Sequence, residues 1–259
     1  MLEFYNTLIQ NGSSEPLVTK SLHRDINILT LNGQKFIQKS SRVRLDKEFS
    51  LMQSFNRPEI GKVLYLISPL SYIMEYYPKG NLNIDNPIEE KTAKSYFKQI
   101  CKCIEILHSN NIVHLDIRLC NFVLGDDEII KIIDFGHSTD DNCDNIHHEM
   151  GSIKYNSPER YLDCYNGYKA DIFSLGVCIF RMLTGSYPFP NTKEACPHYR
   201  LFKNSPENYW KRFSVHLKKH NKKIDLSENT LDLIFWMLEN NPNDRPNIHQ
   251  VLSHNFFIS

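Results

Sequence analysis

The chain lacks a net charge, a long hydrophobic run and an internal repeat. Its 30 basic and 30 acidic side chains cancel, which argues against a dedicated nucleic-acid-binding protein, because such proteins usually carry a net basic charge. The longest segments without Asp, Glu, Lys or Arg, 63–74 and 246–259, are too short for a bilayer, which needs about 20 apolar residues. We therefore expect neither a membrane nor a nucleic acid as a partner.

Signals for secretion and disulfide formation are missing as well. The seven cysteines are odd in number and scattered in apolar stretches, which indicates reduced thiols. The chain begins Met-Leu-Glu-Phe-Tyr, with an acidic residue where a secretory signal would be basic, and it shows no common lipidation motif. Cys143 with His147 and His148 has no second cysteine at zinc-like spacing, so no structural metal is expected. These absences predict a cytoplasmic or nuclear protein.

The composition is that of a globular protein, and the predicted secondary structure changes along the chain from mostly strands to mostly helices. The 259 residues are 41% hydrophobic and 23% charged, which fits one large or two small domains. The first part predicts strands at 7–9, 27–31, 35–38, 63–67 and 72–76, and a helix within 43–55. After a turn near Pro78, helices are predicted at 89–109, 171–183, 227–240 and 248–254, with short strands and turns between 112 and 134.

Two motifs in the middle of the chain carry chemistry. The first reads HLDIRLCN at 114–121, and the second reads DFG at 134–136, directly after an apolar run. Each residue alone is more often a turn or cap residue. Together, two carboxylates and an amide suit phosphoryl transfer, in which one carboxylate orients a hydroxyl and the other groups hold Mg²⁺ on the phosphates.

At these motifs the chain resembles the eukaryotic-type protein kinase family, in its serine/threonine branch. The resemblance continues in GSIKYNSPE at 151–159, DIFSLGV at 171–177 and NPNDRP at 241–246, where Arg245 would pair with Glu159. It implies an α+β, two-lobed kinase-like fold in a single domain, residues 1–259. A small antiparallel-sheet N-lobe with one helix would cover about 1–77, and a larger, mainly helical C-lobe about 78–259.

The resemblance implies a role for each matching residue. Lys39, held by Glu48, would position the phosphates of ATP, while Asn121 and Asp134 would hold Mg²⁺. Asp116 would orient the substrate hydroxyl and accept its proton. Arg118 takes the place of the usual Lys and would stabilise the transferred phosphoryl group.

Further positions would bind the nucleotide. Gly12 is the one glycine left in the best match to the family's phosphate-covering loop, at 9–17, and Ile37 stands where the family usually has Ala. The remaining nucleotide-binding positions implied by the resemblance are Leu17, Met74, Glu75, Tyr77, Asn81 and Val123. A loop poor in glycine approaches phosphates less closely, so the strength of ATP binding stays open.

The chain departs from the family in the segment that is commonly phosphorylated. Leu115 stands where many kinases carry a phosphate-binding Arg, and residues 140–151 contain no Ser, Thr or Tyr. Activity is therefore predicted not to depend on phosphorylation in this window. Ser152 and the ending Tyr-x-x-Pro-Glu resemble the branch that phosphorylates Ser and Thr of protein substrates.

Two other classes stay open at this point. The degraded glycine loop fits a pseudokinase that acts as a scaffold with weak or no ATP turnover, and the fold also occurs in small-molecule kinases. The complete set of catalytic residues argues against the pseudokinase. The segment 151–159, which builds a peptide-docking platform in the family, argues against the small-molecule kinase. A regulatory protein partner is a further expectation. The basic cluster at 218–223 is interpreted as a solvated loop.

Overall fold

The computed structural model describes all residues except 1, 18–23, 142, 148–150, 220–223 and 259. The chain forms two compact units: unit 1 contains residues 1–80 and 123–136, and unit 2 contains 81–122 and 137–259. The first break lies close to the one expected after residue 77. The return of 123–136 to unit 1 was not predicted.

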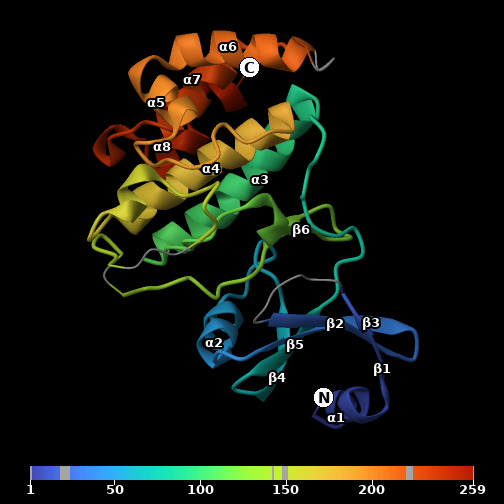
Figure 1. Cartoon of the computed structure of the whole chain (residues 1–259). Coiled ribbons are helices and arrows are strands. Elements are labelled where there is room, and N and C mark those ends of the chain that lie inside the picture. Colours follow the sequence, from blue (N-terminus) through green and yellow to red (C-terminus); the bar gives the residue numbers. More distant parts are fainter. Residues whose placement is uncertain (1, 18–23, 142, 148–150, 220–223, 259) are drawn as a thin grey trace. The chain divides into compact units, whose positions relative to one another are not determined.

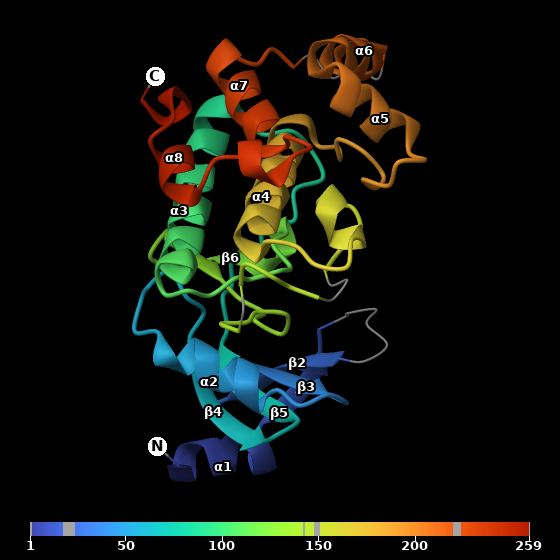
Figure 2. The same ribbon diagram turned by 90° about the vertical axis from the view of Figure 1, so that its left-hand side faces the viewer.

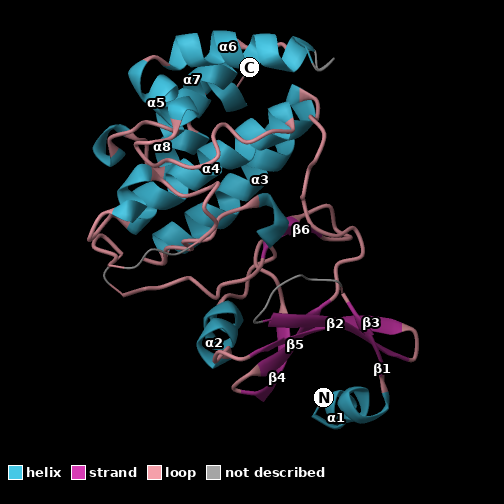
Figure 3. Ribbon diagram, in the orientation of Figure 1, coloured by secondary structure: helices cyan, strands magenta, loops and turns pink. Residues whose placement is uncertain are grey.

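Unit 1 is built on a five-stranded antiparallel sheet in the order β1-β2-β3-β5-β4 (Figures 1 and 3). Its strands are β1 (Ser13–Pro16), β2 (Arg24–Leu31), β3 (Gln34–Ser41), β4 (Val63–Ser68) and β5 (Ser71–Glu75). The last four confirm the strands predicted from the sequence. Asn32 and Gly33, both with positive φ, join β2 to β3, as a two-residue hairpin requires.

The register of the strands sorts their side chains onto two faces of the sheet. Ile28, Ile37 and Met74 lie opposite one another in one row, and the next row on the same face contains Ile26, Lys39 and Tyr72. The other face carries the apolar side chains of Leu29 and Ile73, which form a core cluster with a helix at the start of the chain.

That helix, α1 (Leu2–Asn11), covers one face of the sheet (Figures 1 and 2). Leu8 is fully buried, and the ring of Tyr5 stacks on that of Tyr65 with 5.2 Å between centroids. The strand predicted at 7–9 is therefore wrong, and so is the expectation of a single helix in this part. A three-residue apolar run with a β-branched residue at each end does not distinguish strand from helix.

Gly12 consequently lies between a helix and a strand rather than in a loop joining two strands. Its N–H donates to the carbonyl of Leu8, at 3.0 Å, and a Cβ here would collide with that same oxygen. Close backbone approach explains this glycine without a phosphate. The expectation that 9–17 forms the phosphate-covering loop is wrong for its helical part, and the connection from β1 to β2 spans 17–23, of which 18–23 lie outside the described residues.

The rest of unit 1 packs beside the sheet. Helix α2 (Asp46–Ser54) falls inside the predicted 43–55, and its Phe49 ring lies 5.8 Å from that of Tyr72. Strands β6 (Phe122–Leu124) and β7 (Ile130–Ile132) form a two-stranded sheet. Gly61 donates to the carbonyl of Ile132, at 2.8 Å, and so fastens β7 to the chain that follows α2.

Unit 2 is helical, and its centre is α4 (Gly167–Thr184), which is buried on nearly all sides. Helices α3 (Glu90–Ser109) and α7 (Glu228–Met237) pack against α4, and α8 (Ile248–Leu252) packs against α3 (Figures 1 and 2). Helices α5 (Pro197–Asn204) and α6 (Pro206–Lys219) pack on each other. Short 3-10 helices are η1 (Leu119–Asn121), η2 (Pro158–Tyr161), η3 (Pro242–Asp244) and η4 (Asn255–Phe257). The predicted helices are confirmed, with ends shifted by a few residues.

Among the described residues, none of the helices has the length and apolar character that a membrane span requires. The basic cluster begins with Lys218 and Lys219 at the end of α6. Residues 220–223, the remainder of that cluster, lie outside the described residues, so its interpretation as a loop stays a prediction.

We predict that Leu8→Ala lowers the free energy of unfolding by about 2–4 kcal/mol, the usual cost of truncating a fully buried leucine. Ile9→Ala, at a neighbouring position that is 39% exposed, is the control and should cost less than about 1 kcal/mol. Urea unfolding followed by circular dichroism measures both. Equal losses in the two variants would show that α1 does not cover the sheet.

Candidate active site

In unit 1, Lys39 lies at the centre of a buried ionic cluster. Its side chain projects from β3 and is 4% exposed as a residue. Its Nζ lies 2.7 Å from Oε1 of Glu48 on α2 and 2.8 Å from Oδ1 of Asp134, which follows β7. The expected pair of Lys39 with Glu48 is therefore confirmed. The two residues are close in sequence and can still meet, because Glu48 lies in the first turn of α2, which begins at Asp46.

Glu48 is held by three donors on one oxygen. Besides Lys39, the hydroxyl of Tyr72 donates to Oε1 at 3.0 Å, and the N–H of Phe135 donates to it at 3.1 Å. Burial raises the pKa of Tyr72 well above its ordinary value, and the nearby negative charges of Glu48 and Asp134 act in the same direction. Tyr72 thus stays protonated and remains a donor. The network fixes the start of the DFG segment to α2.

Asp134 binds a second cation that the sequence analysis missed. Arg24, at the start of β2, donates from Nη1 to both carboxylate oxygens, at 2.9 and 2.8 Å. Asp134 itself has a φ of +64°, a strained backbone conformation of the kind that gathers at functional positions. Arg24 is two positions before Ile26 on β2, so the two side chains lie on the same face of the sheet as Lys39. The sequence could show this alternation but not the strand register that brings Arg24 to Asp134.

The single carboxylate of Asp134 forms ion pairs with two cationic side chains, Lys39 and Arg24. Carboxylate and amide oxygens are the donors that Mg²⁺ prefers, and Lys39 adds a buried point charge suited to phosphate. Asp134 and Lys39 of unit 1 therefore fit a metal–nucleotide ligand by their chemistry, and the amide oxygen of Asn121, in unit 2, is separately a donor of the kind that Mg²⁺ prefers.

Ile37 and Met74, two of the nucleotide-binding residues expected in unit 1, lie on the face of the sheet opposite α1. Ile37 and Met74 face each other across β3 and β5, one row away from Lys39. Leu17 is 42% exposed, and its N–H donates to the carbonyl of Ile26 at 2.8 Å. Leu17 therefore continues the pairing of β1 with β2 and lies beside Ile26, which is opposite Lys39. This arrangement forms an apolar surface next to a cation.

Glu75 and Tyr77 lie at and just after the end of β5. The N–H of Glu75 donates to the carbonyl of Lys62 at 2.9 Å, so it is engaged within the sheet. The buried Tyr77 hydroxyl accepts from the N–H of Lys62 at 2.9 Å and donates to the Glu75 carboxylate at 3.1 Å. Its side chain is therefore structural, and only backbone atoms are candidates for nucleotide contacts. Val123 on β6 is buried.

In unit 2, Asp116 is the centre of a second network. Its residue is 8% exposed. Ser152 donates to its Oδ1 at 3.0 Å, and the amide of Asn121 donates to its carbonyl at 2.9 Å and to its Oδ2 at 3.3 Å. Arg118 donates to the hydroxyl of Ser152 at 2.8 Å, with its Nε 3.7 Å from Oδ2 of Asp116. The structure thus brings together Asp116, Arg118 and Asn121, and it adds Ser152.

Asn81, also in unit 2, is exposed, and its Oδ1 accepts from the N–H of Asn83 at 3.1 Å. This contact forms a turn on its own. The role of Asn81 toward a nucleotide therefore remains a prediction.

The backbone of the loop that carries Asp116 is hydrogen-bonded to Asp171 of α4. This fully buried carboxylate accepts from the N–H of His114 at 2.8 Å and of Leu115 at 2.9 Å, and it bonds with His108 at 3.1 Å. Burial by itself would raise the pKa of Asp171. The hydrogen bond from His108 and the charges of His108 and His114 outweigh that effect, so the pKa lies below its ordinary value of 3.8.

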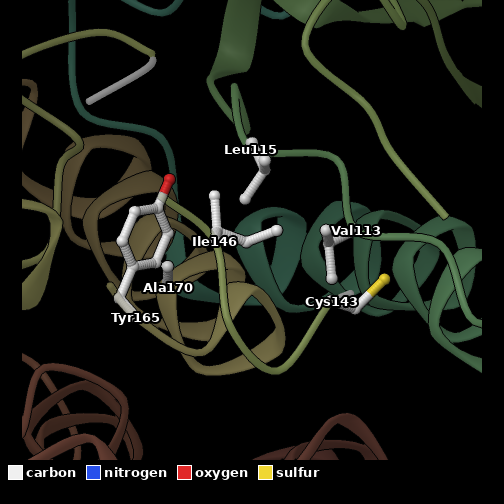
Figure 4. Packing of buried hydrophobic residues seen from close by; sticks show 6 residues of the cluster. All are labelled: Val113, Leu115, Cys143, Ile146, Tyr165 and Ala170. Atoms are coloured by element: carbon white, nitrogen blue, oxygen red, sulfur yellow. The ribbon is translucent and has the colours of Figure 1, made fainter. Parts of the chain in front are cut away.

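Leu115 is fixed from two further directions. Its carbonyl accepts from Nη2 of Arg160 at 2.7 Å, and its φ is +62°. Its side chain belongs to a buried apolar cluster with Val113, Cys143, Ile146, Tyr165 and Ala170. Figure 4 shows Ile146 between Tyr165 and Val113, beneath Leu115. An apolar cluster therefore occupies the place where an Arg would bind a phosphate.

The segment 139–165 is attached at several points besides this cluster. The backbones of Ile146 and Tyr165 bond each other in both directions, at 2.8 and 3.0 Å, and Val113 pairs with Thr139 in the same way. The expected pair of Glu159 with Arg245 is confirmed as a buried, bidentate contact of 2.5 and 2.7 Å. Bidentate arginine–carboxylate pairs combine strength with fixed geometry.

We predict that Asp171→Asn lowers the free energy of unfolding by about 3 kcal/mol near neutral pH, because its amide cannot accept from every donor that now faces the carboxylate. A depressed folded-state pKa contributes stability that is complete above the unfolded-state value of 3.8 and is lost as the pH falls through the folded-state value. The difference between the two proteins should therefore shrink below pH 3.8. Chemical unfolding over a pH series measures it, with exposed Asp225→Asn as control. A difference that is constant down to the lowest pH would contradict the assignment.

Comparison with known proteins agrees with this geometry. The family model described as "Protein kinase domain" matches residues 19–257. The chain is 34% identical over 194 residues to "Probable serine/threonine-protein kinase 2" of Plasmodium falciparum, covering 72% of this chain and 36% of that protein. It is 32% identical over 269 residues to "Serine/threonine-protein kinase PLK4" of Drosophila grimshawi, covering 99% and 34%.

A human relative, "Hormonally up-regulated neu tumor-associated kinase", is 31% identical over 224 residues, covering 81% of this chain and 29% of that protein. The chain thus spans about a third of the length of these relatives. The family implies ATP as a substrate, usually with Mg²⁺, and a protein as the phosphate acceptor. On the family model and on a fold with a small antiparallel sheet and a helical unit, the chain belongs to the eukaryotic-type serine/threonine protein kinase family.

Proposed function

We propose that this chain is an ATP-dependent kinase that transfers the γ-phosphoryl group to Ser or Thr hydroxyls of protein substrates. The observation that carries the proposal is the geometry around Asp116. Its carboxylate is oriented by Ser152 on one oxygen and by Asn121 and Arg118 on the other. A buried, oriented carboxylate at this motif is what a substrate hydroxyl needs in order to be positioned for attack.

Unit 2 would provide the groups that act on the acceptor. Asp116 would accept a hydrogen bond from the substrate hydroxyl and take its proton as the hydroxyl oxygen bonds to the γ-phosphorus, while the bond from that phosphorus to the β–γ bridging oxygen of ATP breaks and ADP leaves. Arg118 is 38% exposed at its side chain and lies beside Asp116, so its guanidinium is placed to stabilise charge on the moving phosphoryl group. Ser152 keeps the two side chains apart and aligned through one hydrogen bond to each.

Unit 1 would provide the groups that hold ATP. Lys39, aligned by Glu48, would bind the α- and β-phosphates, and Asp134 would be a ligand of Mg²⁺. Asn121, in unit 2, is the other side chain expected to bind the metal. The bound metal would neutralise charge on the β- and γ-phosphates. Leu17, Ile37, Met74 and Val123 would contact the adenine through apolar atoms, the backbone of Glu75 and Tyr77 would bond its edge, and Asn81 would bond the ribose. Gly12 is not part of this proposal, since it belongs to the junction of α1 and β1.

Two further properties rest on sequence and structure together. We propose that the kinase needs no phosphate in 140–151, because Cys143 and Ile146 of this segment pack in an apolar cluster with Leu115, the position where many kinases carry a phosphate-binding Arg. We also propose a cytoplasmic or nuclear location. Seven cysteines without a disulfide support it, five of them buried, as is usual in reducing compartments.

The pseudokinase alternative is not favoured. The Lys39–Glu48 pair is assembled, Asp134 lies beside it, and Asp116 is oriented by three neighbours. A scaffold that no longer transfers phosphate has no physical need for all of these contacts at once.

We predict that Asp116→Asn lowers kcat for phosphorylation of a protein substrate by at least about a hundredfold, because it removes the proton acceptor. Binding of a fluorescent ATP analogue should change less than about threefold, since Lys39 is untouched. Asp225→Asn, at an exposed position of the same unit, is the control and should keep normal turnover. Retention of most of the turnover by the Asp116 variant would refute the assigned role.

A further inference from the structure

A groove of about 550 Å³ opens in unit 2 between the chain that follows α4 and helices α5 and α6. Its lining is largely aromatic and includes Tyr187, Phe189, Tyr209 and Phe213. These rings pack on one another, with centroids of Phe189 and Tyr209 6.4 Å apart and those of Tyr209 and Phe213 5.8 Å apart. A floor built from packed rings is firm and offers apolar contact area to a bound side chain.

The rim of this groove is basic. Lys154, Arg212, His198 and His216 line it, and no Asp or Glu of the described residues does so. Lys154 and Arg212 are both exposed, and neither forms an ion pair with a described residue. Lys154 lies with its Nζ 4.5 Å from the centre of the Tyr187 ring. In a chain whose total charge is zero, the groove thus collects positive charge over an apolar floor.

The groove also begins next to the residues that act on the acceptor. Lys154 follows Ser152 by two positions, and Ser152 donates to Asp116 at 3.0 Å. Two residues of extended chain span at most about 7 Å. A peptide whose hydroxyl reaches Asp116 therefore brings residues a few positions away within reach of Lys154. The next basic side chain of the rim, Arg212, projects from α6.

We propose that this groove binds an acidic segment of the protein substrate, and this inference rests on the proposed kinase function. Asp or Glu side chains of the substrate pair with Lys154 and Arg212, while one apolar side chain rests on the partly exposed rings of Tyr187 and Phe213. The groove then selects substrates whose Ser or Thr lies near acidic residues with a hydrophobic neighbour. Complementary charge on a peptide increases both its rate of association and its discrimination from basic peptides.

The test is a binding measurement on the whole chain that needs no phosphoryl transfer. The probe is a fluorescent peptide with Ala in place of the acceptor, Glu on its flanks and one Phe; a second peptide has every Glu replaced by Lys. Fluorescence anisotropy should give at least about tenfold tighter binding of the acidic peptide, and the difference should fall with added salt. Lys154→Glu combined with Arg212→Glu should abolish this preference or invert it toward the basic peptide. Lys98→Glu, on the exposed side of α3, is the control and should leave it intact.

Equal binding of both peptides by the unaltered chain, or an acidic preference that survives in the double variant, would overturn the proposal. A double variant that keeps its peptide preference but loses binding to phosphatidylserine vesicles would assign the groove to a lipid surface instead. Turnover of matching Ser-containing peptides separates the two claims. Equal kcat/KM for acidic and basic peptides refutes the groove and keeps the kinase, whereas acidic-peptide binding without any turnover refutes the kinase and keeps the groove.

Discussion

The structure of unit 2 depends on how the backbone at Leu115 is held. Its N–H donates to the buried carboxylate of Asp171 at 2.9 Å, and its carbonyl accepts from Arg160 at 2.7 Å. Its side chain packs in the apolar cluster with Ile146 and Tyr165. These contacts enforce a φ of +62°, which an isolated leucine would avoid. Because Asp116 is the next residue, the direction of its carboxylate is set by this fixation.

The same constraint supports the proposal that the kinase needs no phosphate in the segment after DFG. In many relatives of this fold a charged pair between an Arg and a phosphate orders the segment after DFG. Here the residue before Asp116 is apolar, and the segment contributes Cys143 and Ile146 to the same cluster. Burial of these side chains stabilises the packed arrangement by about 25 cal/mol for each Å² of apolar surface removed from water, without any modification. Cys143 and Ile146 are therefore held in place by the packing of their own side chains.

Sequence reasoning reached the features that depend on short motifs and on strong periodicity. The pairs Lys39–Glu48 and Glu159–Arg245 were predicted and are present, and the central strands and α3, α4, α7 and α8 lie where expected. Helix α1 was missed because its inward face carries only Tyr5 and Leu8 as core residues. The contact of Arg24 with Asp134 was missed because it depends on strand register and on a partner 110 positions away. The basic groove was missed because it depends on the tertiary packing of four separated segments.

The central claim is that apolar packing at Ile146 replaces phosphorylation. The measurement that tests it most directly compares kcat of phosphatase-treated protein, shown by intact mass to carry no phosphate, with that of its Ile146→Asp variant. The account predicts unchanged turnover for the phosphate-free chain and at least about a tenfold loss in the variant, because a buried unpaired carboxylate disrupts the cluster. Val215→Asp, at a position 52% exposed, should retain activity. Loss of turnover on phosphatase treatment, or full turnover of the Ile146 variant, would contradict the account.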